Sequence, residues 1–590
     1  MPNEEMDYRK LFDLIRDNRG ISDIWGKVLG MLHEDLGYPD RVLILLCLYF
    51  SLTDDGNICI PLDPRVLKLE LDRKCNPTGI DARAMIELGI NELKGFSGLD
   101  GLFKVVGIDG DDWLFSQKFY DAKTIIEKRI SILFPGSGRP RYHGCDLVLT
   151  SETKKDENQR EAVIKGLEGN LIITGGPGTG KTTVAYDIIK NILINLEKGE
   201  ENIDDWNLFL TAPTGKAKDR LKESILECIE RDTGCTDYQA VIGKLKETEP
   251  HTIHSLLLKY SKDKPFPEKS IFVIDEASMI DVCLFASFMD AIPDGAIVFI
   301  LGDKDQLPSI DAGAVLGDVL GQENGFTVEL KKSHRTNTEI WKASGFINEG
   351  RVSDFFGCRS ERLVIRNTGI IDWIKNHFMK GPGADSKAKA ADFDYDSADQ
   401  VFRLTETAKI LCAERKGLRG ADHINRIAVR TVLGSKPDDY QQFFPGELLM
   451  ITENNNLLGL SNGDNGVVVR FRGDDAGTLW FMIKKGHESG GEERDGIFSR
   501  NGYTYYPLTL IPSESVEVSY AMTIHKSQGS GYNDVLIILP ENEDKQLLNR
   551  QILYTAITRT KGSATIIASE KVLTRAIEKK DVRYTKIRLI

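Results

Sequence analysis

Residues 171–193 read LIITGGPGTGKTTVAYDIIKNIL. A short apolar run typical of a strand leads into a glycine-rich turn, and a stretch with helical periodicity follows. The turn carries the pattern GxxxxGK[ST] from Gly175 to Thr182, and this pattern is most specific between a strand and a helix. It predicts a phosphate-binding loop on a parallel α/β sheet. A chance glycine-rich turn is the alternative.

The chemistry of such a loop predicts ATP and Mg²⁺ as cofactors. Glycines let successive backbone N–H groups turn toward phosphate oxygens, Lys181 adds a point charge for the β and γ phosphates, and Thr182 offers an oxygen to Mg²⁺. The nucleotide-binding residues predicted here are Gly175, Gly176, Pro177, Gly178, Thr179, Gly180, Lys181, Thr182 and Thr183.

A second strand-like run delivers two acids. FVIDEAS at 272–278 places Asp275 and Glu276 at the carboxyl end of a strand, where open α/β sheets bind ligands. We expect Asp275 to hold Mg²⁺ and Glu276 to orient or deprotonate the attacking water, although an acidic pair at a strand end can be purely structural. In LGDKDQLPS at 301–309, Gln306 is a candidate for contacting the γ-phosphate or the water.

Two arginines narrow the class of ATPase. Kinases and simple GTPases also carry a phosphate-binding loop, but Arg335 in SHRT and Arg559 in YTAITRT both fall in a second lobe. Each arginine alone is more often a surface ion pair. If the two lobes face each other, both arginines can reach the γ-phosphate as arginine fingers, which add roughly 10³ to 10⁵ in rate.

The alternation of strand-like and helical stretches predicts an α/β fold with two parallel-sheet lobes. Strand-like runs begin at 171, 208, 271 and 296, and again at 409, 535 and 564, with a β-rich insertion before the last two. The predicted domains are a mainly helical N-terminal domain at 1–125, a linker at 126–150, lobe 1 at 151–325 with a small inserted subdomain near 225–250, lobe 2 at 326–429 and 511–590, and a β insertion at 430–510.

Composition sets outer bounds on function. A net charge of −13 excludes a protein coated in basic surface, but a local groove with a few donors still suffices for nucleic acid. The longest apolar run, VLILLCLYF at 42–50, is too short for a membrane span and predicts a buried helix. The nine cysteines have no zinc-finger spacing, and the acidic N-terminus has no apolar signal core. We therefore expect a cytoplasmic protein with free thiols and no membrane partner.

In order along the chain, the motifs resemble those of superfamily 1 DNA helicases, and more narrowly those of the RecD family, the alpha subunits of exodeoxyribonuclease V (RecBCD). The resemblance covers most of 150–570 and rests on DENQREAV at 156, GGPGTGKTT at 175, TAPTGKAKDRL at 211, TIHSLL at 252, VIDEASMID at 273, LGDKDQLPSIDAGAVLGD at 301, KILCAERKGLRGADHIN at 409, SNGDNGVVV at 461, YAMTIHKSQGS at 520 and LYTAITRTK at 553. Residues 1–125 are similar only in outline.

The resemblance implies two RecA-like lobes with ATP between them, an SH3-like β insertion, and single-stranded DNA across the lobe tops. It implies 5′-to-3′ translocation, and action on single-stranded DNA and duplex ends in a heterotrimer with RecB-like and RecC-like subunits. Gln159 matches the glutamine that reads adenine, and Gln528 and Gly529 match residues that approach the nucleotide. The residues that match the DNA path are Thr214, Lys216, Thr252, His254, Thr523, His525, Lys526 and Ser527.

One position departs from the family. The segment TIHKSQGSGYND at 523–534 has Gly531 where the family usually has a glutamate, which in some relatives contacts the ribose. We therefore expect weaker contact with the sugar.

Three functions stay open on the sequence. They are a helicase subunit of a nuclease–helicase complex, the same motor working alone in repair or on RNA, and a P-loop ATPase that acts as a switch without translocation. The paired arginines and TIHKSQG weigh against the switch. No segment offers a convincing cluster of metal-binding carboxylates beyond Asp275 and Glu276, so we expect no nuclease site in this chain.

Overall fold

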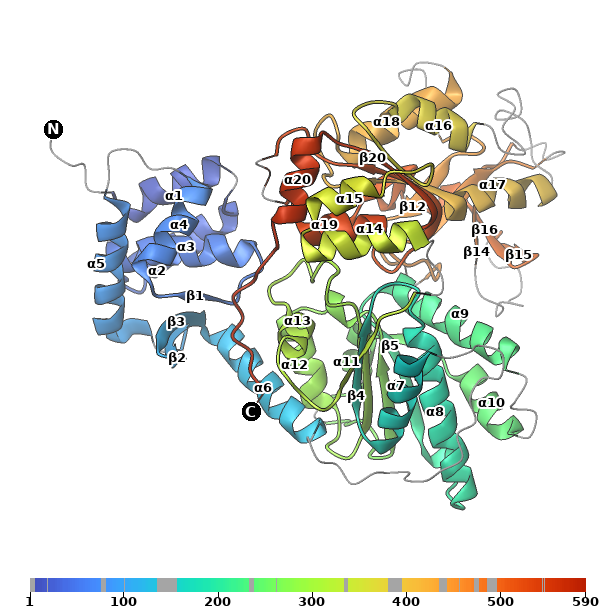
Figure 1. Ribbon diagram of the computed structural model, residues 1–590, viewed down its shortest axis with the longest axis horizontal. Coiled ribbons are helices and arrows are strands. Elements are labelled where there is room, and N and C mark those ends of the chain that lie inside the picture. Colours follow the sequence, from blue (N-terminus) through green and yellow to red (C-terminus); the bar gives the residue numbers. More distant parts are fainter. Residues whose placement is uncertain are drawn as a thin grey trace.

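The computed structural model describes the chain from residue 6 to residue 589, apart from 19, 76–80, 100, 135–155, 233–237, 262, 334–337, 380–394, 435–442, 456, 472–476, 485–495, 544 and 546. It shows an N-terminal domain beside two stacked α/β lobes (Figure 1). None of the helices in these described ranges is both long enough and apolar enough to span a bilayer.

The N-terminal domain is built around one buried helix. Helix α3 (Asp40–Asp54) is apolar on every side, and all its residues from Val42 to Leu52 are buried, as a helix without a polar face requires. This confirms the buried helix predicted at 42–50. The elements around it are α1 (Tyr8–Asp17), α2 (Asp23–Glu34), α4 (Pro64–Lys74), α5 (Ala82–Gly95) and an antiparallel sheet of β1 (Cys59–Pro61), β3 (Asp111–Ser116) and β2 (Phe103–Ile108).

Helix α6 (Gln117–Leu133) runs from this domain onto lobe 1 (Figure 1). Residues 126–133, predicted as part of a linker, are helical instead. Ile126, Ile130 and Leu133 form an apolar face of this helix, and that face is buried against lobe 1. The rest of the predicted linker lies mainly outside the described residues.

Lobe 1 is a six-stranded parallel sheet in the order β6-β5-β7-β8-β4-β9. Successive residues of β7 point to opposite faces: Ile271 and Val273 join one core, Phe272 and Ile274 the other. The strands are β4 (Leu171–Gly175), β5 (Asn207–Ala212), β6 (His251–Thr252), β7 (Ser270–Ile274), β8 (Ile297–Gly302) and β9 (Thr327–Leu330). The helices are α7 (Glu157–Glu168), α8 (Lys181–Lys198), α9 (Gly215–Arg231), α10 (Gln239–Glu247), α11 (Ile253–Lys259), α12 (Val282–Ala291) and α13 (Val315–Leu320).

Two predicted boundaries of lobe 1 need correction. Strand β9 pairs in parallel with β4, so the sheet extends beyond the boundary predicted at 325. The region near 225–250, predicted as a small subdomain, supplies α9 and α10 instead. Their buried side chains, such as Ile225, Val241 and Leu245, belong to the lobe 1 core because they pack against the same sheet face as α8.

Lobe 2 is a five-stranded parallel sheet in the order β10-β20-β19-β11-β18. Two parallel-sheet lobes confirm the predicted α/β fold class. The strands are β10 (Leu363–Arg366), β11 (Ala408–Cys412), β18 (Ala521–Thr523), β19 (Tyr532–Ile538) and β20 (Thr560–Ile567). The helices are α14 (Thr338–Glu349), α15 (Val352–Gly357), α16 (Ile370–Phe378), α17 (Tyr395–Thr407), α18 (Ala421–Leu433), α19 (Arg550–Ile557) and α20 (Glu570–Glu578).

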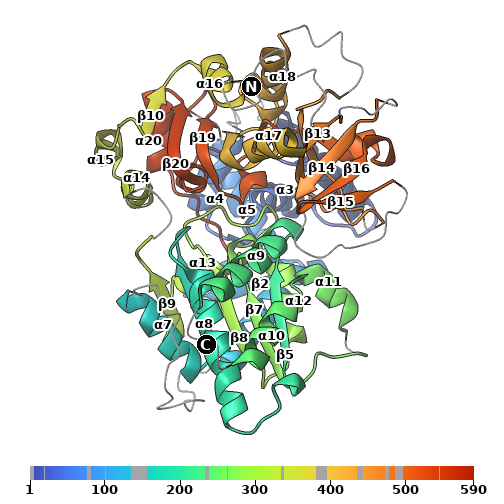
Figure 2. The same cartoon turned by 90° about the vertical axis from the view of Figure 1, so that its right-hand side faces the viewer.

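The insertion is an antiparallel sheet in the order β15-β16-β14-β13-β12-β17, beside lobe 2 (Figure 2). Its strands are β12 (Leu448–Ile451), β13 (Asn465–Val469), β14 (Trp480–Lys484), β15 (Phe498–Arg500), β16 (Tyr503–Pro507) and β17 (Val516–Val518). Because β17 pairs with β12, the insertion extends past its predicted end at 510.

Candidate nucleotide site between the lobes

The phosphate-binding loop lies between β4 and α8, where the sequence predicts it. Gly178 and Gly180 adopt φ of +79° and +85°, a left-handed conformation that favours glycine. The Lys181 ammonium lies over the loop and donates to the carbonyls of Gly175 (2.6 Å) and Gly176 (3.2 Å). The 18-residue helix α8 starts at Lys181, so its N-terminal N–H groups and its dipole favour an anion at this loop.

Gln159 lies against the same loop. Its side-chain amide donates to the Thr179 carbonyl at 2.9 Å, and it lines the cavity described below. The Thr179 hydroxyl is buried and donates to the Gly176 carbonyl at 2.9 Å, so it braces the loop from inside. Thr182 and Thr183 line the cavity at the start of α8.

The acidic pair stands at the carboxyl end of β7. The Asp275 carboxylate accepts the Glu276 N–H at 2.8 Å, and Glu276 is held at φ +51°, an uncommon conformation for a residue with a side chain. Burial and the neighbouring Glu276 charge together raise the pKa of Asp275 to about 6, while Lys181 opposes the shift. Both carboxylates line the cavity.

Gln306 is held by a buried carboxylate. Its amide nitrogen donates to Asp303 at 2.8 Å, and the Tyr554 hydroxyl of lobe 2 donates to the same Asp303 oxygen at 3.1 Å. The Gln306 side-chain oxygen is buried with no hydrogen-bond partner in the described protein, and the residue lines the cavity. Asp303 therefore orients the side chain of Gln306 at the site.

Arg559 reaches the site from lobe 2. Its guanidinium is buried and donates to the carbonyls of Thr555 (3.2 Å) and Ser530 (3.1 Å), while Nη2 has no partner among the described residues. Burial lowers the pKa of Arg559, and the nearby Glu276 charge opposes that shift. The other predicted finger, Arg335, lies outside the described residues.

These side chains surround one cavity of about 730 Å³ between the lobes. Among the described residues, the cavity is lined by six cations, Lys181, Arg220, Arg231, Lys332, Arg559 and Lys561, and by three acids, Glu227, Asp275 and Glu276. The excess of cations in a chain of net charge −13 suits a polyphosphate. The Thr182 hydroxyl and the Asp275 carboxylate are oxygen donors of the kind Mg²⁺ prefers, so the donor set fits a magnesium nucleotide.

Gln528 occupies a different place from the one expected. Its amide nitrogen donates across the cleft to the Leu307 carbonyl at 2.8 Å, and Gly529 rather than Gln528 lines the cavity. The Leu307 N–H in turn donates to the Thr555 hydroxyl at 2.9 Å. Gln528 therefore ties lobe 2 to the loop that carries Gln306.

Several site residues were missed by sequence reasoning: Arg220, Lys332, Tyr554, Thr555 and Lys561. Arg220, Tyr554 and Thr555 sit inside motifs that the sequence does single out, TAPTGKAKDRL and YTAITRT, so the signal for them was position within a motif.

The candidate DNA-contacting residues follow the carboxyl ends of β5, β6 and β18. Thr214 and Thr252 cap helices α9 and α11, His254 is exposed, and Lys216 lies near the Gly463 turn of the insertion. On lobe 2, Thr523 accepts the Lys526 N–H at 3.3 Å, and the exposed Lys526 pairs with Glu517 at 2.5 Å. His525 is partly exposed.

Ser527 does not fit the predicted DNA contact. It is fully buried, and its hydroxyl donates to the Ile524 carbonyl at 2.6 Å within a 3₁₀ turn (His525–Ser527). Its hydroxyl closes that turn, so the side chain shapes the segment rather than facing a phosphate.

Comparison with known proteins agrees with this geometry. Residues 154–369 match the AAA domain family and residues 518–567 the UvrD-like helicase C-terminal domain. RecBCD enzyme subunit RecD of Mycolicibacterium smegmatis is 31% identical over 456 residues, 73% of this chain and 74% of that protein. The ATP-dependent RecD2 DNA helicase of Deinococcus radiodurans is 26% identical over 70% of this chain and 50% of that protein.

Among solved structures, a Bacteroides Pif1 helicase in complex with ADP-AlF3 and ssDNA aligns with TM-score 0.37 and 18% identity, over 72% of this chain and 94% of that chain. The 31% identity to the mycobacterial subunit extends over about three quarters of both proteins. The chain belongs to the RecD family of superfamily 1 helicases.

Proposed function

We propose that this chain is an ATP-dependent DNA helicase that moves 5′ to 3′ on single-stranded DNA, as the RecD-type subunit of a complex with RecB-like and RecC-like subunits. The observation that best supports a motor function is the cavity between the lobes. It joins a phosphate-binding loop and an acidic pair from lobe 1 to a buried, partly unpartnered arginine from lobe 2. Polarity and partners rest on membership of the family.

Each lobe contributes a different part of the ATPase chemistry. Lys181 and the N–H groups of α8 bind phosphate oxygens, and Thr182 and Asp275 would hold Mg²⁺, which neutralises phosphate charge when bound. Glu276 orients the attacking water or takes its proton, and Gln306 offers its unpartnered oxygen to the same water. Arg559, with Arg335 as its proposed companion, stabilises the charge that develops on the transferred phosphoryl group.

Closure of the cleft would couple ATP to movement. Hydrogen bonds of Gln528, Thr555 and Tyr554 to the loop that carries Gln306 link the lobes near the site. On the DNA side, short polar residues and backbone donors at strand ends suit contacts with phosphates that ignore sequence. Opening and closing of the cavity would thus alternate the grip of each lobe on DNA.

Strand displacement tests the proposal. We expect ATP-dependent unwinding of a duplex with a 5′ single-stranded tail and much slower unwinding with a 3′ tail. The Lys181→Ala variant is the matched control. It lacks the positive charge that binds the phosphates, and it keeps the residues that are expected to contact DNA. Equal unwinding of both substrates would contradict the polarity, and elution without two large subunits from native extract would contradict the complex.

A further inference from the structure

Helix α9 of lobe 1 touches lobe 2 and its insertion at separate points, and lies on the side of lobe 1 nearest lobe 2 (Figure 2). Near its start, a Cβ on Gly215 would lie 3.1 Å from the Ser461 Cβ in the insertion. Further along, a Cβ on Gly529 would lie 3.7 Å from the Ala217 Cβ, and Arg220 donates to the Gly529 carbonyl. One helix thus meets both the insertion and the segment TIHKSQGSG.

Arg220 and Arg559 hold neighbouring carbonyls of that segment. Arg220 Nη1, from lobe 1, donates to the Gly529 carbonyl, and Arg559 Nη1, from lobe 2, donates to the next carbonyl, that of Ser530, at 3.1 Å. These carbonyls belong to consecutive peptide groups, which are joined at Ser530. A shift of Gly529 therefore moves one of the two carbonyls that anchor the Arg559 guanidinium.

The surroundings of Arg220 favour its hydrogen bond to the Gly529 carbonyl. Among the described residues no carboxylate lies within ion-pair distance of its guanidinium, so a neutral carbonyl is its anchor. Arg220 is half-buried and lines the nucleotide cavity with Lys181 and Arg559. Burial dominates both the upward pKa shift of Asp275 and the downward pKa shift of Arg559; the Arg220 charge opposes the first shift and adds to the second.

Arg220 also stands one helical turn from the DNA side of lobe 1. Lys216, a candidate DNA contact, and Arg220 are four residues apart on α9, so they lie on the same face of the helix. Thr214 caps this helix, and its hydroxyl accepts the Ala217 N–H at 3.2 Å. A displacement at the start of α9 is therefore carried directly to Arg220.

We propose that Arg220 is a positioning residue for ATP hydrolysis: it orients Arg559 through the Gly529–Ser530 peptide and links that orientation to the DNA-contacting end of α9. This inference rests on the proposed function, because it assigns Arg559 a role on the transferred phosphoryl group. It adds an arginine of lobe 1 to Arg559, the arginine that lobe 2 supplies to the reaction.

The test is a double-mutant cycle on ATP hydrolysis in the presence of single-stranded DNA, with the full-length protein. Arg220→Ala is expected to lower kcat roughly 10- to 100-fold, as misplacement of a catalytic group does, while KM for ATP changes by less than about threefold. Added to Arg559→Ala, it is expected to lower kcat no further, because it acts through that arginine.

Two matched variants separate positioning from folding. Arg220→Lys keeps a donor that reaches one carbonyl and is expected to restore kcat partly. Lys218→Ala, which removes a cation paired with Asp219 on the same helix and outside the cavity, is expected to leave kcat unchanged. Affinity for single-stranded DNA is expected to stay the same in the Arg220 variants.

The outcomes are distinguishable. Multiplicative losses in the double mutant, a rise in KM with unchanged kcat, or no rescue by Arg220→Lys would each overturn the positioning role. A wild-type protein without DNA-stimulated ATP hydrolysis would instead overturn the proposed function, and the inference with it.

Discussion

At the level of single residues, burial and cation binding have opposite effects on the ionised form of Asp275. Burial and the adjacent Glu276 charge raise its pKa from an ordinary 3.8 to about 6, because both disfavour the ionised form. A carboxyl with a raised pKa costs folding free energy once it is ionised, so this penalty grows as the pH rises from about 4 to about 6 and persists above. A bound cation would remove that penalty, which is how a ligand site differs from a structural acid pair.

This carboxyl makes Mg²⁺ binding dependent on pH. Protons compete with the cation below pH of about 6, so the apparent Mg²⁺ affinity of the nucleotide-bound protein is expected to fall up to about tenfold per pH unit there. Titration of Mg²⁺ by calorimetry from pH 5 to pH 8 measures it, with Asp275→Asn as the control that removes the dependence. A flat affinity across that range would contradict Asp275 as a ligand.

Gly531 tests the expected loss of sugar contact. A Cβ at this position would lie 3.4 Å from both the Arg220 Nη2 and the Lys561 Cε, so the cavity wall accepts a side chain there with small shifts of two flexible ends. We expect Gly531→Glu to sharpen the preference for ATP over deoxy-ATP, measured as the ratio of kcat/KM, relative to Gly531→Gln. An unchanged ratio in both variants would show that this position does not reach the ribose.

At the scale of the element, the turn from β4 into α8 depends on its glycines. Gly180 caps α8 at φ +85°, and a Cβ there would lie 2.6 Å from the Gln159 amide nitrogen. A side chain at this position therefore meets both backbone strain and a clash with the residue expected to read adenine. The phosphate-binding loop and α7 therefore pack closely together at Gly180 and Gln159.

Gly180→Ala is accordingly expected to weaken nucleotide affinity about tenfold or more and to lower the thermal midpoint, because the strain amounts to roughly 1–2 kcal/mol before the clash is counted. Gly243→Ala is the matched control: it lies in α10 with open space around its Cβ, so alanine is expected to be neutral or slightly stabilising. Fluorescent-nucleotide binding compares the two. Equal affinities would mean that the loop does not need its left-handed turn.

The site residues on these elements could be predicted, because the sequence shows which polar residues follow each strand. A polar residue directly after an apolar strand marks the ligand edge of a parallel sheet, so Lys181, Asp275 and Gln306 were found at the site. Contacts between the lobes were not predictable: Tyr554 meets Asp303, and Arg220 meets Gly529, across hundreds of residues. Nor could a motif separate Gln528, which ties the lobes together, from Gly529, which lines the cavity.

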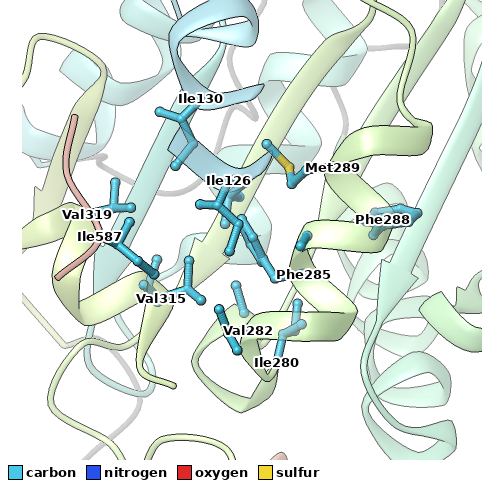
Figure 3. Packing of buried hydrophobic residues seen from close by; sticks show 14 of the residues in the cluster. Ile126, Ile130, Ile280, Val282, Phe285, Phe288, Met289, Val315, Val319 and Ile587 are labelled. Carbon is cyan, nitrogen blue, oxygen red and sulfur yellow. The ribbon is translucent and has the colours of Figure 1, made fainter. Parts of the chain in front are cut away.

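In the molecule as a whole, the C-terminal residues 579–589 contact the N-terminal domain, lobe 1 and lobe 2. This segment leaves α20, passes between the N-terminal domain and the lobes, and ends beside α6 (Figure 1). Asp581 exchanges two hydrogen bonds of 2.9 Å with Gln551 of lobe 2. Ile587 packs with Ile126 and Ile130 of α6 and with Val315 and Val319 of α13 (Figure 3).

Within that segment, Arg583 and Tyr584 connect the N-terminal domain to the loop after Gln306. Arg583 Nη1 donates to the carbonyls of Ser309 (2.9 Å), Asp311 (3.2 Å) and Gly313 (2.9 Å). The Tyr584 carbonyl accepts the Ile58 N–H at 3.0 Å. The placement of the N-terminal domain is therefore coupled to a loop of the nucleotide site, which boundaries drawn along the sequence did not reveal.

Arg583→Ala should expose this coupling. Loss of a half-buried donor to three carbonyls is expected to cost about 1–3 kcal/mol locally and to speed amide exchange at Ile58 about tenfold or more. Arg359→Ala, which breaks an exposed ion pair with Glu570, is the control and costs about 0–1 kcal/mol. Hydrogen exchange read by mass spectrometry separates them, and equal exchange at Ile58 in both variants would contradict the coupling.

In the proposed function, ATP is hydrolysed between the two lobes and DNA governs the rate. The most direct measurement is the steady-state ATPase rate with and without single-stranded DNA, for the wild type and for Lys181→Ala and Arg559→Ala, one variant from each lobe. We expect strong stimulation of the wild type by DNA and loss of roughly 10³-fold or more in rate in Arg559→Ala, with DNA binding retained. Equal rates with and without DNA, or full turnover in either variant, would contradict it.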